Sequence, residues 1–224
     1  MILEIPGGTF DTEAHLYRDP SGAFVPSLTQ VLKLQGLSDY SGIDEAVLEN
    51  AARRGSEVHE LAAAYNQFGE TDPNWISDET RPYFDAYMQF LADTGFKPDP
   101  AWVEKPMIAT IHGFKLGITP DCFGKLRRDQ VVLEFKCTAT RQPSWTIQTA
   151  LQEMGIFASN RCGRVRRYAL MLMKTGKYNL GDEHTDHESD MANGIAALRN
   201  VHWRLAHGQN LHKKLIAQPA LEAV

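Results

Sequence analysis

The sequence has few cysteines and no long apolar run. Its 224 residues include only three cysteines, Cys122, Cys137 and Cys162, and these are widely spaced. This pattern does not suit a disulfide framework, so we expect a reducing, cytoplasmic compartment. Three scattered cysteines are also too few for a four-cysteine iron–sulfur cluster, and we predict none.

Signals for membranes, secretion and a nucleotide-driven motor are also lacking. No window approaches 18 consecutive apolar residues, so no membrane partner is expected. Residues 1–10, MILEIPGGTF, have neither the basic start nor the apolar stretch of a signal peptide. The phosphate-binding pattern of helicase motors, G-x-x-x-x-G-K-[S/T], does not occur, so any motor is a separate protein.

What is present is typical of a globular protein. Hydrophobic residues make up 43% and charged residues 23% of the chain, which is long enough to bury an extensive core. The net charge of −5 does not favour a protein that coats nucleic acid, although the distribution of charge matters more than its sum. Without a linker or repeat, we predict one domain over residues 1–224, with a core of about 26–207 and a weakly informative tail.

The order of elements predicts an α+β or mixed α/β fold, with a central mixed sheet flanked by helices. Residues 1–26 look irregular. Capping residues and helical spacing predict helices, at 28–36, 44–68, 78–94, 144–160 and 186–207. Alternating or continuous apolar runs predict strands, at 101–107, 108–116, 116–126, 131–137, 164–174 and 178–180.

The most informative segment is the hairpin around residues 127–130. A turn there pairs Leu126 with Val131 and places Asp121 opposite Lys136. Because opposed residues share a face and side chains alternate along a strand, Asp121, Glu134 and Lys136 should emerge on one face. A slip of one residue would send Asp121 to the other face.

Two interpretations of this face are open. A Glu-x-Lys pair on a strand is commonly a solvent-exposed ion pair of little energetic value. Here the apolar run Val131, Val132 and Leu133 instead indicates a buried strand, in which Glu134 and Lys136 would be costly unless they bind something. The second interpretation therefore predicts a functional site.

Two carboxylates beside a pocket suit a hard dication such as Mg²⁺, which takes oxygen ligands and keeps several waters. The backbone carbonyl of Phe135 lies between the side chains of Glu134 and Lys136 along the chain and is a further candidate ligand. A charged Lys136 cannot bind the metal, but it can orient a water or stabilise charge that develops on a phosphate.

At this point the residues resemble a known family. Pro120-Asp121 followed by Glu134-Phe135-Lys136 resembles the PD-(D/E)XK motif of metal-dependent nucleases, which have a restriction-endonuclease-like core. Three other segments resemble motifs of its RecB-like branch, which includes phage exonucleases and the mitochondrial genome maintenance exonuclease. They are Pro26–Thr29 (PSLT), Gly55–His59 (Gly-x-x-x-His) and Gln148–Gln152 (Gln-x-x-x-Tyr, with Gln152 in place of tyrosine).

The resemblance implies hydrolysis of DNA phosphodiesters that depends on Mg²⁺ or Mn²⁺, in a bacterial or phage-infected cell. It assigns metal binding to His59, Asp121 and Glu134, the role of catalytic lysine to Lys136 and a supporting role to Gln148. It also implies DNA as partner, either single-stranded or with free ends, and a possible single-strand annealing or recombination partner protein.

Several further residues are candidates on chemical grounds, each with a structural alternative. Gln148 and Gln152 share a helix face and can contact phosphate, or they form a polar helix flank. Arg164 and Arg166 can follow a DNA backbone, or they are ordinary surface charges. Glu104 can join the acidic pocket, although exposed strand carboxylates are common. Three aromatic residues can stack on unpaired bases or pack in the core, Tyr65, Trp75 and Trp145.

Together these observations predict a metal-dependent DNA exonuclease, in which a cation activates the attacking water. An endonuclease on the same core is the nearest alternative. The other is a nucleic-acid-binding module that has kept the fold without the activity.

Overall fold

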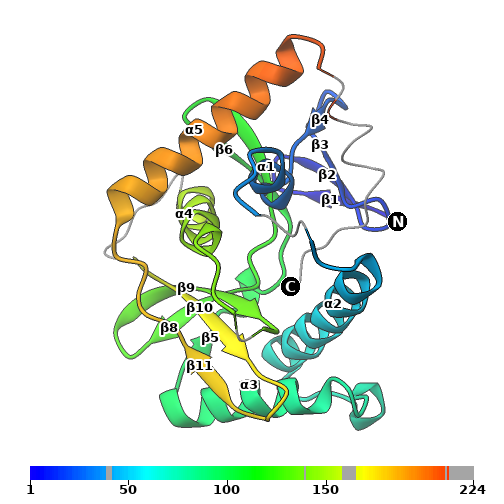
Figure 1. Cartoon of the computed structure of the whole chain (residues 1–224), viewed down its shortest axis with the longest axis vertical. Helices are drawn as coiled ribbons and strands as arrows, with labels where there is room; N and C mark the ends of the chain where they lie inside the picture. The colour runs from blue at the N-terminus through cyan, green and yellow to red at the C-terminus, as the bar shows by residue number, and fades with distance from the viewer. Residues whose placement is uncertain (39–41, 139, 158–164, 210, 212–224) are drawn as a thin grey trace.

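The computed structural model describes residues 1–38, 42–138, 140–157, 165–209 and 211. This part of the chain is a mixed α+β structure, as the order of elements predicts. Figure 1 shows the central sheet between α4 on one side and α3 on the other, with α5 lying across α4 at a distance from the sheet. Within the described residues, no helix has the length and apolar character needed to cross a bilayer.

The α-helices begin and end largely where capping residues predict. They are α1 (Leu28–Leu34), α2 (Glu45–Phe68), α3 (Arg81–Thr94), α4 (Ser144–Ile156) and α5 (His187–Ala206). Ser27 and Gln30 form a capping box at the start of α1, and the Asp44 carboxylate accepts hydrogen bonds from the first turn of α2. Gly95 ends α3 with φ of 64°, a left-handed conformation that costs glycine little.

The central sheet contains five strands in the order β11-β10-β9-β8-β5. Its strands are β5 (Lys97–Pro98), β8 (Cys122–Leu126), β9 (Asp129–Lys136), β10 (Val165–Leu172) and β11 (Tyr178–Leu180). Strand β9 pairs in parallel with β10, and every other pair is antiparallel. The sheet is therefore mixed, with β9 at its centre.

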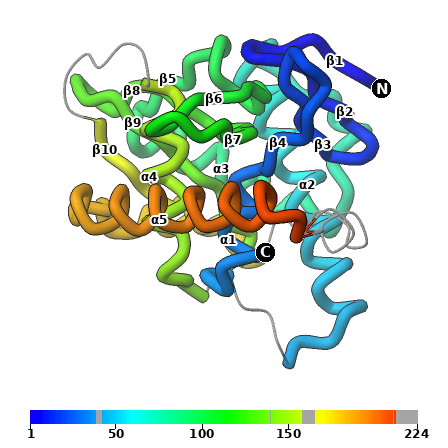
Figure 2. The backbone as a smooth tube through the Cα atoms, turned by 90° about the horizontal axis from the view of Figure 1, so that it is seen from above, coloured from blue at the N-terminus to red at the C-terminus, as the bar shows by residue number. Residues whose placement is uncertain are grey.

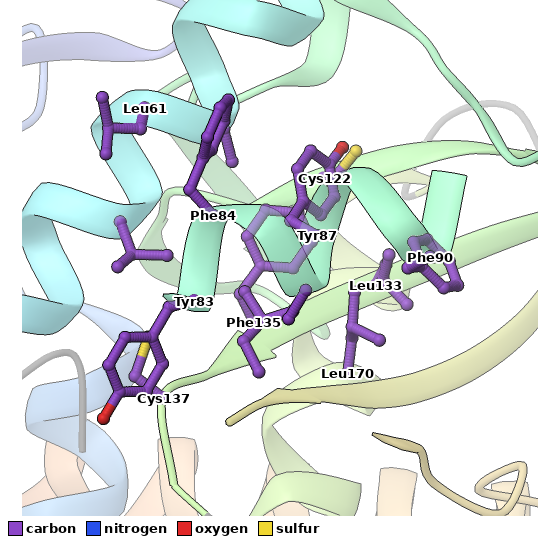
Figure 3. Close-up of a cluster of buried hydrophobic side chains, with 14 of the residues drawn as sticks. Leu61, Tyr83, Phe84, Tyr87, Phe90, Cys122, Leu133, Phe135, Cys137 and Leu170 are labelled. Carbon is purple, nitrogen blue, oxygen red and sulfur yellow. The ribbon is translucent and has the colours of Figure 1, made fainter. Parts of the chain in front are cut away.

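Both faces of β9 are buried, and its side chains alternate between two environments. Val131, Leu133 and Phe135 join a large apolar cluster with residues of α2 and α3, including Tyr87 and Phe90 (Figure 3). The alternate residues, among them Glu134 and Lys136, face α4. The strand is thus apolar toward α3 and carries its acid and amine toward α4.

A hairpin of β6 (Met107–Ile111) and β7 (Phe114–Ile118) packs beside the central sheet. Its side chains Ile111, Leu116 and Ile118 pack against α1, α4 and α5. Ile108 points instead into a small cluster of the N-terminal sheet with Phe10 and Tyr17.

The prediction of an irregular N-terminal segment is wrong. Residues 1–26 contain a four-stranded antiparallel sheet of β1 (Ile2–Ile5), β2 (Gly8–Asp11), β3 (Leu16–Arg18) and β4 (Phe24–Val25). Its strands have two to four residues, too few to display a period of two. Figure 2 shows this sheet beside β6 and β7, with α5 crossing below them.

Other boundaries also differ from the prediction: the segment 116–126 is not one strand, because β7 ends at Ile118 and β8 begins at Cys122. Residues 101–106 do not form a strand: a 3₁₀ turn, Pro100–Trp102, leads into an irregular segment before β6, and the prolines at 100 and 106 have no N–H to donate to a strand ladder. Helix α3 starts at Arg81 rather than near residue 78. The helix predicted over 144–160 is shorter in the structure, where α4 ends at Ile156. Residues 158–160 of the prediction lie outside the described residues.

Candidate active site

The β8–β9 hairpin has a tighter register than the sequence-based prediction. Leu126 pairs with Asp129 instead of Val131, so the turn contains only Arg127 and Arg128. Extending this register beyond β8 places Asp121 opposite Glu134 rather than Lys136. The difference is two residues, which preserves the face on which each side chain emerges.

Asp121, at the bend before β8, is fixed to the central strand by a backbone contact. The Phe135 N–H donates a 2.6 Å hydrogen bond to Asp121 Oδ2. The N–H and C=O groups of one strand residue point toward the same neighbouring strand, so the Phe135 carbonyl also faces the side of Asp121. Phe135 is not among the described lining residues of the cavity, so the role of its carbonyl as a further ligand stays a prediction.

His59, Glu104 and Asp121 bring one ligand atom each to within 4.8 Å of one another. His59 Nδ1 lies 3.1 Å from Glu104 Oε1 and 3.5 Å from Asp121 Oδ1. The imidazole reaches the two acids from α2, with its ring edge-on to Phe135. Glu104, which the sequence suggested only as an additional acid of the pocket, is therefore one of the three residues that form this group.

Glu104 reaches this position through an unusual backbone conformation. Its φ is 45°, in the left-handed region that non-glycine residues seldom occupy. The Glu104 N–H is held by the carbonyls of Pro120 and Asp121, at 3.1 and 3.4 Å. A backbone held in this sparsely populated conformation beside other polar side chains is typical of a functional site.

Glu134 is buried beneath the same cavity and receives three hydrogen bonds. Its Oε1 accepts from Lys136 Nζ at 2.9 Å and from the Gln148 amide at 2.6 Å, and its Oε2 accepts from the Gln152 amide at 2.6 Å. A carboxylate offers about four lone-pair directions. One direction on Oε2 therefore stays available for a ligand.

Lys136 lies behind Glu134, away from the cavity. Its ammonium group contacts Glu134 and the Gln148 carbonyl oxygen at 3.2 Å, and lies over the Trp145 ring. The described residues that line the cavity do not include Lys136. In this arrangement the amine neutralises and orients the buried Glu134 carboxylate.

The electrostatics of the group favour protons or a cation. Burial opposes the charged form of His59, but the negative charges of Asp121, Glu104 and Glu134 outweigh burial and raise the His59 pKa to about 10. Burial, and next the charge of Glu134, raise the pKa of Asp121 well above its ordinary value. Clustered acids of this kind hold protons until a positive ion replaces them.

The donor atoms of this group can hold a metal ion. Carboxylate oxygens and imidazole nitrogens are both common metal ligands in proteins. Two buried polar atoms at the site, His59 Nε2 and Gln152 Oε1, have no hydrogen-bond partner within the described ranges. Buried polar atoms are normally satisfied, so these two are consistent with a site that receives water or a ligand.

The group opens into a cavity of about 440 Å³. One wall is α2, and the opposite wall combines residues of the N-terminal sheet with the start of α1, including Tyr17, Ser27 and Thr29. Gln148 and Gln152 of α4 close the inner end with Glu134. Residues from motifs that are more than 100 positions apart in the chain thus face one space.

The structure does not bring Arg166, the described one of the two predicted arginines, to this cavity. Arg166 is paired with Glu183 and Asp129 at 2.8 and 3.2 Å. Its partner across the parallel pair is Val131, so it emerges on the face of the sheet opposite to Glu134. Arg164 lies outside the described residues.

Sequence reasoning missed one residue of the cavity that is placed for ligand contact, Phe68. It is the last residue of α2 and lines the cavity while 75% exposed. Its position at the predicted end of this helix, residue 68, is the only sequence signal. By contrast, Trp145 is a core residue, and Trp75 is exposed on the 3₁₀ turn Pro73–Trp75 and is not among the described lining residues.

Comparison of the chain with protein-family models and with curated proteins finds no match.

Proposed function

We propose that the protein is a Mg²⁺- or Mn²⁺-dependent deoxyribonuclease that hydrolyses phosphodiester bonds as an exonuclease. One observation carries the proposal: His59, Glu104 and Asp121 converge within 4.8 Å, in a cavity that Glu134 also lines. The motif resemblance to PD-(D/E)XK nucleases of the RecB-like branch, with a restriction-endonuclease-like core, supports the same function.

His59, Asp121, Glu134 and the Phe135 carbonyl are the proposed metal-binding groups, and Glu104 joins them. A bound cation would neutralise charge on the phosphate and lower the pKa of a water molecule. The carboxylate of Glu104 or Asp121 could also act as the general base that accepts a proton from the attacking water.

Lys136 and the two glutamines act on Glu134 in this proposal. Their N–H groups hold the carboxylate in one orientation, with one Oε2 lone pair directed away from the three donors. Lys136 is thus a positioning residue for Glu134. Its positive charge offsets the negative charge of the buried Glu134 carboxylate.

A degradation assay with purified protein tests the proposal. Linear DNA should be degraded in Mg²⁺ or Mn²⁺ and should stay intact in excess EDTA. Asp121→Ala, Glu134→Ala and Lys136→Ala should each remain folded and lose activity. Asp85→Asn is a matched control, because Asp85 is an exposed acid of α3 that is not among the described lining residues of the cavity.

The substrate form separates the alternatives. A circular single strand has no end, so its cleavage would favour an endonuclease over an exonuclease. Full activity of Asp121→Ala would refute the assigned site. DNA binding without turnover and without dependence on metal would instead favour a binding module.

A further inference from the structure

The wall formed by α2 has a regular layout. The cavity is lined by residues that recur at helical spacing along this helix: Ser56, His59, Glu60, Ala63, Ala64, Gln67 and Phe68. Residues three and four positions apart share a helix face, so they form a continuous stripe, here called the α2 track. From His59 to Phe68 the track rises about 13–14 Å at 1.5 Å per residue.

The size of the side chains changes along the track. Ala63 and Ala64, in the middle, leave room above the helix, whereas Phe68 at the end presents a phenyl ring that is 75% exposed. Two other aromatic residues of the described chain are comparably exposed, Trp75 at 67% and Trp203 at 56%. Neither is among the described residues that line this cavity.

Apart from two histidines, His15 and His59, the described lining of the cavity has no side chain that can carry a positive charge and attract phosphates. Its described lining residues include four acids, Glu60, Glu104, Asp121 and Glu134, and no lysine or arginine. The opposite wall offers neutral hydroxyl groups, such as those of Ser27 and Thr29. Affinity for a nucleic acid must therefore come from a divalent ion at the inner end and from uncharged contacts along the track.

Stacking is the uncharged contact that Phe68 can provide. Every base has a π-face, and an exposed aromatic ring binds unpaired bases in this way without regard to sequence. In a duplex, each base face is covered by its neighbours except at the terminal pair. An exposed ring next to a cavity therefore favours a strand whose bases are unpaired.

We infer that the α2 track binds the single-stranded end of a DNA chain, with an unpaired base stacked on Phe68 and the phosphate to be cleaved beside His59. The inference rests on the proposed function and names its substrate class. Stacked nucleotides rise about 3.4 Å each, so the track spans roughly four of them, or fewer in an extended strand. Shorter oligonucleotides reach both ends of the track only in an extended conformation.

Binding assays test this without relying on cleavage. Fluorescence anisotropy would follow a labelled oligothymidylate of about ten nucleotides, which exceeds the track length, in Ca²⁺, an ion that accepts oxygen ligands in a flexible geometry. Gel analysis would verify that the probe stays intact. Phe68→Ala and Phe68→Leu should raise the Kd roughly 5- to 100-fold, the range expected for loss of one stacked base.

Two matched controls isolate stacking. Trp75→Ala removes an equally exposed aromatic ring outside the cavity and should leave the Kd unchanged. An abasic strand of the same length keeps the phosphates but has no base to stack, so the wild type and Phe68→Ala should bind it equally. Because Phe68 is exposed, the variants should melt at the wild-type temperature.

The outcomes are distinct for the two proposals. If the wild type and Phe68→Ala both bind oligothymidylate tightly, the inference that a base stacks on Phe68 of the α2 track is wrong. The nuclease proposal would be unaffected by this result. An equal loss of affinity for the abasic strand also overturns it, since phosphate contact would then explain the effect. If the wild type binds no DNA with any divalent ion, both proposals fail.

Discussion

The side-chain nitrogen of Gln152 lies 2.6 Å from Oε2 of Glu134 and donates a hydrogen bond to it. Gln152→Met keeps the approximate shape and removes the donor, leaving a buried carboxylate with one partner fewer. We expect the free energy of unfolding to fall by about 1–3 kcal/mol and DNA cleavage to decrease, as measured by urea denaturation and initial rates. Gln89→Met makes the same change at an exposed position of α3 that is not among the described lining residues of the cavity, and it should alter neither stability nor the cleavage rate.

Glu104 offers a direct test of the metal-binding group. Glu104→Gln removes one negative charge beside His59 and Asp121, and calorimetric titration with Mn²⁺ should show an affinity at least roughly tenfold weaker. Glu60→Gln also removes a charge from the cavity wall, at an exposed position outside the group. Equal loss in the two variants would indicate a general effect of charge and would contradict a ligand role for Glu104.

The half-buried His184 predicts a specific acid sensitivity. Its Nδ1 lies 2.9 Å from Thr149 Oγ1, and burial, followed by the charge of Arg167, lowers the His184 pKa from 6.5 to about 4. As the pH falls from 6.5 to 4, the unfolded chain takes up a proton that the folded chain resists. The stability contributed by the neutral ring is therefore complete above pH 6.5 and is lost through this window.

Solvent screening of the partly exposed ring limits the loss to about 1–2 kcal/mol, or several degrees in melting temperature. His184→Asn keeps a side chain that can form a hydrogen bond with Thr149 Oγ1 but does not titrate. Thermal melts at pH 7 and at about pH 4.5 should show a smaller fall for this variant than for the wild type. Parallel curves for the two proteins would contradict the prediction.

Gly117 permits the N-terminal sheet to approach the β6–β7 hairpin. A Cβ atom at this position would lie 2.3 Å from Cδ2 of the Tyr17 ring. Gly117→Ala should therefore lower the free energy of unfolding by about 1–3 kcal/mol through overpacking. In a Tyr17→Leu background the same change should cost less, because the ring that it strikes is absent. Equal costs in both backgrounds would place the strain elsewhere.

The helices and the functional face could be predicted because their signals are local. Ser27, Asp44 and Gly95 carry cap chemistry that depends on a few neighbouring residues. The faces of β8 and β9 depend only on whether the register is odd or even. The two-residue error at Leu126 therefore left the shared face of Asp121 and Glu134 intact.

The remaining features depend on tertiary contacts. Glu104 reaches His59 from an irregular segment with a left-handed φ, and no periodicity predicts this conformation. The face on which Arg166 emerges follows from the parallel register of β10 on β9. The sequence does not reveal this register, because a crossover rather than a tight turn joins the two strands. Tyr17 lines the cavity because the short N-terminal strands hold it there. These strands have only two to four residues each, too few to show the alternation of apolar and polar residues that predicts a strand.

Strand β9 has hydrogen-bonded neighbours along both edges and packed side chains on both faces. Its amide protons should therefore be among the last in the protein to exchange with deuterium, since elements of this kind open only on global unfolding. The opposite wall belongs to a small sheet with its own apolar cluster of four buried residues, Phe10, Tyr17, Val25 and Ile108. When a ligand of a different width enters the cavity, we therefore expect the small N-terminal sheet to move. Glu134 should stay in place, because it belongs to the strand whose amide protons exchange most slowly.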